Sequence, residues 1–183
     1  STSRLQLIEK LADFNEEIMA LYYEEKEVPE ELIKKAAREA TIKLLITPVF
    51  CGAAYKNKGV QLLLDAVVDY LPSPIDKGAI VGSDPDDSEK MKTRNPSTKE
   101  PFSALAFKVI NDAFVGQQTF VRIYSGTLKS GMQVANSTKG KEERIGRLLR
   151  IKAKEREEVF EAGPGDIVAL IGMKFTKTGD TLC

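Results

Sequence analysis

The sequence lacks residue types on which common enzyme chemistry depends. Its 183 residues include no histidine, no tryptophan and only two cysteines, Cys51 and Cys183. Without histidine, Ser-His-Asp catalysis, Cys-His catalysis and histidine-containing zinc or iron sites are excluded. Two isolated cysteines are too few for a cysteine-rich metal site or a disulfide framework. We therefore expect no catalytic residues and no metal site in this chain.

Long hydrophobic runs are also missing. No segment approaches the roughly 18 consecutive apolar residues that a membrane-spanning helix requires. The first residues, Ser1-Thr2-Ser3-Arg4, do not begin a signal peptide. We expect a soluble, cytoplasmic protein without a membrane partner.

Excess charge of one sign is found only locally, because 27 basic residues balance 27 acidic ones. Residues 1–75 hold 9 basic and 12 acidic side chains, whereas residues 101–183 hold 13 and 9. The basic side chains concentrate in residues 139–156, at Lys139, Lys141, Arg144, Arg147, Arg150, Lys152, Lys154 and Arg156. This stretch either contacts an anionic partner or forms a solvated strand face.

The N-terminal part has helical periodicity. Apolar residues recur at spacings of three and four between Leu5 and Tyr22, and a second helix begins near Pro29. From Thr41 to Phe50 the helical period ends and a short apolar run follows, made of Ile42, Leu44, Leu45, Ile46, Val49 and Phe50. That run predicts a strand buried on both faces, from about Ile42 to Phe50, although Pro48 is unusual there.

A small-residue turn follows the predicted strand, and helical spacing returns over residues 59–71 before Pro72. Strand, turn and helix together are typical of the last step of an α/β domain. Residues 75–100 combine Gly82, Pro85 and Pro96 with dense mixed charge, which predicts a linker or an extended loop.

In the C-terminal part the helical period disappears, and apolar residues recur at every second position in Phe102, Ala104 and Ala106. Phe120, Arg122 and Tyr124 likewise share one face, with Val121 and Ile123 on the opposite one. Turn signals such as Ser125-Gly126 and Ser130-Gly131 separate these short segments. The pattern predicts an antiparallel barrel or sandwich.

Motifs for nucleotide chemistry are mostly absent. No segment fits the phosphate-binding pattern G-x-x-x-x-G-K-[ST]. Asn57-Lys58-Gly59-Val60 begins like the guanine-reading element N-K-x-D, but Val60 lacks the carboxylate. The acidic pairs Glu142/Glu143 and Glu157/Glu158 lie in charge-rich surroundings and are interpreted as ordinary surface residues.

Two long segments resemble translation elongation factor G. The first is Ile46-Thr47-Pro48-Val49-Phe50-Cys51-Gly52-Ala53-Ala54-Tyr55-Lys56-Asn57-Lys58-Gly59-Val60-Gln61, continuing to Pro74. The second part of the chain agrees independently through Tyr124 to Gly131, Glu143 to Arg150, Ala162 to Ile167 and Thr178 to Leu182.

The resemblance implies a division of the chain. Residues 1–74 correspond to the end of the family's GTPase domain, including the end of its insert, residues 75–100 to a linker, and residues 101–183 to the second, β-barrel domain. The implied fold class is α+β: a remnant of an α/β GTPase domain, with helices plus its last strand and helix, followed by an antiparallel translation-factor-type β-barrel. We leave open whether the barrel lacks its last strand.

The resemblance also implies a function. Full-length members hydrolyse GTP and promote translocation of tRNA and mRNA on the ribosome, using GTP or GDP and magnesium. The phosphate loop, the switches and the N-K-x-D element precede the point where this chain begins. We therefore expect a fragment that supplies interdomain and ribosome contacts, holds no cofactor and is not itself a GTPase.

Two groups of site residues follow from the resemblance. Gly52, Ala53, Ala54 and Tyr55 match the fifth guanine motif, in which backbone N–H groups help to recognise the base. Ala53 stands where serine is usual. The small-subunit rRNA contacted by the family's second domain makes Arg144, Arg147, Arg150 and Lys152 candidates for RNA contact. The three arginines recur every third residue, so on a strand they would alternate faces.

Two alternatives remain open: a ribosome-protection factor of the same superfamily, and a stand-alone barrel that binds RNA or protein. A further expectation concerns the Ile42–Phe50 strand, whose sheet neighbours are absent from this chain. Unpaired strand edges attract other strands, so we expect the chain to self-associate through the truncated sheet.

Overall fold

The computed structural model describes residues 2–85, 87, 89–112 and 116–183. It divides into two compact units, Ser1–Pro72 and Ser73–Cys183, and each is described by itself.

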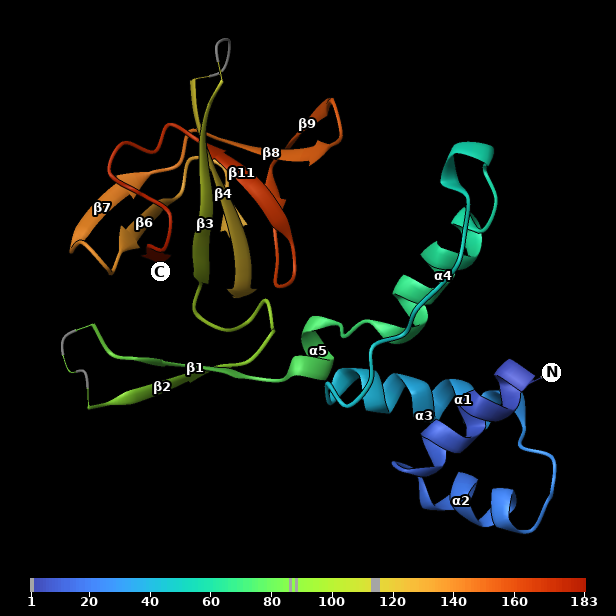
Figure 1. The fold of residues 1–183 in the computed structure, drawn as a ribbon. Helices are drawn as coiled ribbons and strands as arrows, with labels where there is room; N and C mark the ends of the chain where they lie inside the picture. Colours follow the sequence, from blue (N-terminus) through green and yellow to red (C-terminus); the bar gives the residue numbers. More distant parts are fainter. Residues whose placement is uncertain (1, 86, 88, 113–115) are drawn as a thin grey trace. The chain divides into compact units, whose positions relative to one another are not determined.

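The described residues of the first unit form the α-helices α1 (Thr2–Ala12), α2 (Glu16–Tyr23), α3 (Glu30–Ile42) and α4 (Val60–Tyr70) (Figure 1). The predicted helical segment from Leu5 to Tyr22 is divided because Asn15 caps α2, its side chain accepting a hydrogen bond from the N–H of Ile18 at 3.0 Å. The core of this unit comprises Ile8, Leu11, Ala12, Ile18, Val28, Ile33, Ala36 and Ala37.

The strand predicted from Ile42 to Phe50 is absent. Helix α3 continues to Ile42, and Leu44 adopts a positive φ of 60°. The residues that follow form no strand, and Leu44 and Val49 are 83% and 85% exposed. The physical reason is that a strand buried on both faces needs hydrogen-bonded neighbours, and no described segment of the first unit supplies a strand beside it.

Helix α4, predicted over residues 59–71, is confirmed as Val60–Tyr70. Its apolar residues cover the helix except for one polar stripe at Gln61, Asp65 and Asp69, but among the α4 side chains only Ala66 is buried. The exposed ones include Leu62, Leu63, Leu64, Val67 and Val68. So wide an apolar face normally packs against a protein core, so the described residues of this unit present an uncovered apolar surface on α4.

The second unit begins with structure where the sequence predicted a linker or extended loop. A short helix α5 (Pro74–Lys77) starts at Ser73, whose side chain and that of Asp76 form a reciprocal capping box. Strands β1 (Ile80–Ser83) and β2 (Met91–Arg94) then pair as an antiparallel hairpin. Strand pairing therefore corrects the loop prediction for residues 80–94, although few large apolar residues signalled it.

The remaining strands form the antiparallel barrel predicted for residues 101–183 (Figure 1). They are β3 (Ser103–Asp112), β4 (Gly116–Ser125), β5 (Leu128–Lys129), β6 (Gln133–Asn136), β7 (Lys141–Arg144), β8 (Arg147–Lys152), β9 (Glu155–Val159), β10 (Glu161–Ala162), β11 (Ile167–Ile171) and β12 (Thr181–Leu182). Eight of them pair in the order β7-β6-β12-β3-β4-β11-β8-β9, and β5 pairs with β10.

The barrel has its own apolar core. Its fully buried members come from most of the strands: Ala106, Val121, Ile123, Leu128, Ile145, Leu148, Leu170 and Leu182. Gly126 follows β4 at φ 70°, where a Cβ atom would lie 2.5 Å from the Cα of Phe102. Only glycine permits this approach between the start and end of the β3–β4 hairpin.

The C-terminal strand is not an edge. Thr181 pairs with Leu105 of β3 and Leu182 with Ala104, while Leu182 also pairs with Asn136 of β6. Strand β12 is therefore an inner strand of the sheet. Strands β7 and β9 end the eight-stranded sheet instead, and the exposed residues Glu155, Arg156, Glu157 and Glu158 cover β9 with charge.

Candidate functional site

The turn with the guanine-motif residues is compact and fully at the surface. The backbone N–H of Ala53 donates to the carbonyl of Lys58 at 2.9 Å, and the N–H of Lys58 donates back to Ala53 at 3.1 Å. A one-turn 3-10 helix, Ala54–Lys56, lies between these residues. A Cβ on Gly52 would approach the Lys58 carbonyl to 3.1 Å, so a small residue is favoured there.

This geometry limits what the turn can recognise alone. The N–H of Ala53 is already bonded within the turn, and Gly52 to Tyr55 are all exposed, with the Tyr55 ring wholly uncovered. One exposed turn offers few contacts to a base, so measurable affinity requires further binding elements. The guanine role of these residues stays a proposal.

The four basic candidates are all engaged in local interactions. The Arg144 Nε donates to the carbonyl oxygen of Gly131 at 3.1 Å. The other three form ion pairs: Arg147 with Glu158 at 3.8 Å, Arg150 with Asp166 at 3.7 Å and Lys152 with Glu157 at 3.2 Å. An RNA phosphate would therefore compete with a nearby carboxylate for each of these three cations.

Strand register shows that these cations do not share one face. Arg150 lies opposite Glu157 in the β8–β9 pair, and Leu149 lies opposite Glu158. Arg147, two residues before Leu149, therefore lies on one face of β8, while Arg150 and Lys152 lie on the other. The expectation that the arginines alternate is confirmed within β8, and one flat partner cannot contact all of them.

The surface interpretation of the acidic pairs is wrong for Glu143, whereas Glu142, Glu157 and Glu158 are exposed as expected. Glu143 lies opposite the buried Val134 in the β6–β7 pair and is only 7% exposed. Its carboxylate accepts the backbone N–H groups of Lys174 at 2.6 Å and Phe175 at 2.7 Å. A signal was present, because Glu143 is in period-two phase with the buried Ile145.

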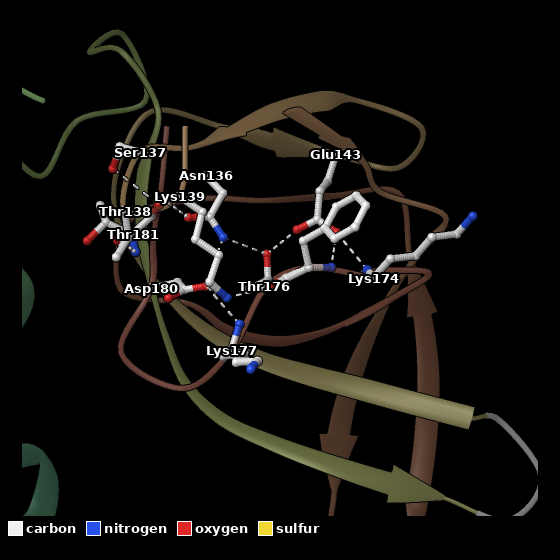
Figure 2. Close-up of polar contacts among 11 residues, drawn as sticks. Asn136, Ser137, Thr138, Lys139, Glu143, Lys174, Thr176, Lys177, Asp180 and Thr181 are labelled. Carbon is white, nitrogen blue, oxygen red and sulfur yellow. Dashed lines mark hydrogen bonds and ion pairs between the residues drawn. The ribbon is translucent and has the colours of Figure 1, made fainter. Parts of the chain in front are cut away.

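Figure 2 shows how Glu143 and Asp180 belong to one buried polar cluster. Thr176 joins them, since its hydroxyl donates to Glu143 and accepts from the Asn136 side chain at 3.3 Å. Asn136 also donates to Asp180 at 2.8 Å, and Lys139 forms an ion pair with Asp180 at 2.7 Å. The cluster ties the loop before β12 to the β6–β7 hairpin.

Burial and hydrogen bonding oppose each other at both carboxyl groups. Burial alone would raise the pKa of Glu143, but hydrogen bonds from the Thr176 hydroxyl and from the backbone of Phe175, Lys174 and Thr176 hold it below its ordinary value. Burial alone would likewise raise the pKa of Asp180, but hydrogen bonds from Lys139, Asn136 and the backbone of Lys177 hold it below its ordinary value. Both groups are ionised at neutral pH and fully used in structural bonds.

Two further features do not occur among the described residues. No group of three or more His, Cys, Asp or Glu side chains there could hold a metal ion. No described helix is both long and apolar enough to cross a membrane.

The barrel matches a known family over its whole length. A family model described as elongation factor G domain 2 matches residues 101–183. The barrel is therefore similar to the second domain of elongation factor G. The family resemblance drawn from the sequence is thereby confirmed, and the exposed arginines, Lys152 and the Glu143 cluster all lie within the matched domain.

The comparison with solved structures extends across both units. A crystal structure of a protein from Thermus thermophilus is similar over 98% of this chain, with 27% sequence identity and a TM-score of 0.71. This chain covers 24% of that protein's chain. It therefore spans about a quarter of the length of the structure it resembles, and the turn at Gly52–Tyr55 lies outside the elongation factor G domain 2 match.

The buried cluster predicts that the barrel of residues 101–183 is sensitive to acid. Because both folded-state pKa values are lowered, the unfolded chain takes up protons first as the pH falls below about 4.5, the ordinary value for Glu143. Stability should therefore be fully present above that pH and decline below it. Urea unfolding followed by circular dichroism between pH 7 and pH 3 measures the decline.

A Glu143→Gln variant should be less stable at pH 7 and should lose less stability on acidification. Glu155→Gln, at an exposed glutamate of β9, is the matched control and should follow the unaltered chain. An acid dependence in the Glu143→Gln variant equal to that of the unaltered chain would contradict this account.

Proposed function

We propose that this chain is part of a translation elongation factor G, the GTPase that promotes movement of tRNA and mRNA on the ribosome. The observation that carries the proposal is the match of residues 101–183 to elongation factor G domain 2. The similar Thermus thermophilus structure is about four times longer, which supports a larger parent protein. The chain contributes interdomain and ribosome contacts to that parent, in the cytoplasm.

This chain holds candidate residues for only one part of the parent's nucleotide, the guanine base. Gly52 to Tyr55 would lie against the guanine base, with backbone N–H groups as donors. Magnesium and the phosphates require other residues, because the described residues include no cluster of acidic side chains suited to a metal. GTP or GDP would therefore be bound by the parent and not by this chain alone.

The first prediction from this proposal is that the 183-residue chain does not bind GTP measurably. Phosphate and metal contacts supply most of the affinity in such sites, and this sequence has no phosphate-loop pattern. Titration calorimetry with GTP and magnesium tests this directly. A micromolar dissociation constant would show that the turn at Gly52–Tyr55 is a competent site.

We further propose that part of the basic stretch contacts small-subunit rRNA. Clustered cations in a domain of this family support the proposal. The β8–β9 register limits how many of these cations one RNA segment can contact. Arg150 and Lys152 share one face of β8 and Arg147 lies on the other, so one RNA segment engages only a subset. The ion pairs with Glu157, Glu158 and Asp166 would exchange for phosphate contacts.

Replacing Arg144, Arg147 and Arg150 together with Ala in the full-length factor should weaken ribosome association. Each lost phosphate contact lowers the logarithmic salt slope by about one unit, and we expect a fall of about one or two units because of the face restriction. The control replaces Lys10, Lys26 and Lys34, which are similarly ion-paired surface cations. If the salt slope of ribosome association were unchanged in the arginine variant, these arginines would be ordinary solvated surface residues.

We also propose that the isolated chain self-associates. The predicted truncated sheet does not form, so the contact would instead use uncovered apolar side chains, including Leu44, Val49 and those of α4. Bringing such surfaces together removes apolar area from water.

Light scattering over a concentration series should reveal association that a Leu64→Lys and Val68→Lys double variant suppresses. Both side chains are exposed, at 61% and 76%, so the substitutions should not disturb the helical core. A strictly monomeric chain at millimolar concentration would refute self-association.

A further inference from the structure

An exposed aromatic ring lies beside a lysine, next to the buried polar cluster that contains Glu143 and Thr176. Phe175 is 45% exposed although it lies next to the buried Thr176. The ammonium of Lys141 lies 4.3 Å from the centroid of the Phe175 ring. Lys141 and Glu143 occupy the same face of β7, because they are two residues apart on a strand. Lys141 therefore points toward the loop that carries Phe175.

The backbone beneath the ring is firmly held. Glu143 accepts the N–H groups of both Lys174 and Phe175, and the Phe175 carbonyl accepts a hydrogen bond from the Lys139 ammonium. Both hydrogen-bonding groups of the Phe175 backbone are thus fixed by side chains of the β6–β7 hairpin region. A ring on a fixed backbone loses little entropy when it binds a partner.

The charge around this ring differs from that around the arginines. Within the part of the chain that the structure describes, neither Lys141 nor Lys174 has a carboxylate within ion-pair distance, and Lys139 is paired with the buried Asp180. By contrast, Arg147, Arg150 and Lys152 each pair with a carboxylate. An incoming phosphate would therefore neutralise Lys141 and Lys174 without displacing a protein carboxylate.

We propose that Phe175, Lys141 and Lys174 form a platform that binds single-stranded RNA. An unstacked base lies on the exposed part of the Phe175 ring that the Lys141 ammonium does not cover, and the two ammonium groups contact the flanking phosphates. This inference rests on the proposed function, since it names the RNA form and the residues that a ribosome-contacting barrel uses. It assigns the contact to Phe175 and Lys174, which lie outside the basic stretch, and to Lys141, which belongs to that stretch but is not one of its four RNA-contact candidates.

Single-stranded RNA fits this surface better than an acidic protein does. An acidic peptide would be satisfied by the lysines alone and would gain little from a rigid aromatic face. Stacking requires a planar partner, and a base in duplex RNA is already stacked on its neighbours. The combination of a ring with cations on a rigid loop is therefore the decisive feature.

Fluorescence anisotropy with a labelled 12-residue oligouridine tests the platform in the 183-residue chain. At low salt, Phe175→Ala should weaken binding by about tenfold or more without changing the salt slope. Phe175→Tyr should restore most of the affinity. Lys141→Ala with Lys174→Ala should lower the slope by about 0.7 for each lysine. Phe160→Ala, at a ring that is 82% exposed beside Glu161, is the matched control and should have no effect.

Three results would overturn the inference. One is unchanged binding by Phe175→Ala, and another is an equal loss in Phe160→Ala. The third is an equal dependence on Phe175 for duplex RNA or polyglutamate, which would indicate a general polyanion or an acidic protein instead. Urea unfolding of Phe175→Ala separates lost binding from lost structure. If Phe175→Ala left oligouridine binding unchanged while the full-length factor still associated with the ribosome, the platform would be refuted. The proposed function would not be affected.

Discussion

The buried carboxylate of Glu143 organises the part of the barrel on which the last strand depends. It holds the loop after β11 through two backbone N–H groups and the Thr176 hydroxyl, and Thr176 connects it to Asn136. Asn136 then lies opposite Leu182. The final strand can insert between β3 and β6 because the preceding loop is bonded to the hairpin beside it. A buried charge is tolerated here because several donors replace the lost water.

Sequence reasoning succeeded where local signals agree with long-range packing. Alternating residues and glycine turns predicted the barrel, and helical spacing predicted α4, because each element carries its own pattern. It failed at Ile42–Phe50, where an apolar run predicts a strand but the chain turns instead at Leu44. A strand buried on both faces forms only where neighbouring strands pair with it. The local sequence pattern does not indicate whether such neighbours are present.

The candidate site was predictable to a similar extent. The sequence located the basic stretch and the alternation of its arginines, but the ion pairs with Glu157, Glu158 and Asp166 depend on β8–β9 register and on a turn beyond it. Glu143 was mistaken for a surface residue because Lys141 to Arg144 is uniformly charged. The contact between Lys141 and Phe175 joins residues 34 positions apart, and only the folded loop brings them together.

The charged strand β9 has a consequence for how copies of the molecule can assemble. As an end strand of the eight-stranded sheet, it would offer its backbone to a strand from a neighbouring molecule. Glu155, Glu157 and Glu158 would then face the same residues of a second copy, and like charges directly opposite one another disfavour the pairing. Growth of the sheet from barrel to barrel through this edge is disfavoured. Two barrels are thus kept from continuing one another's sheet through paired β9 strands.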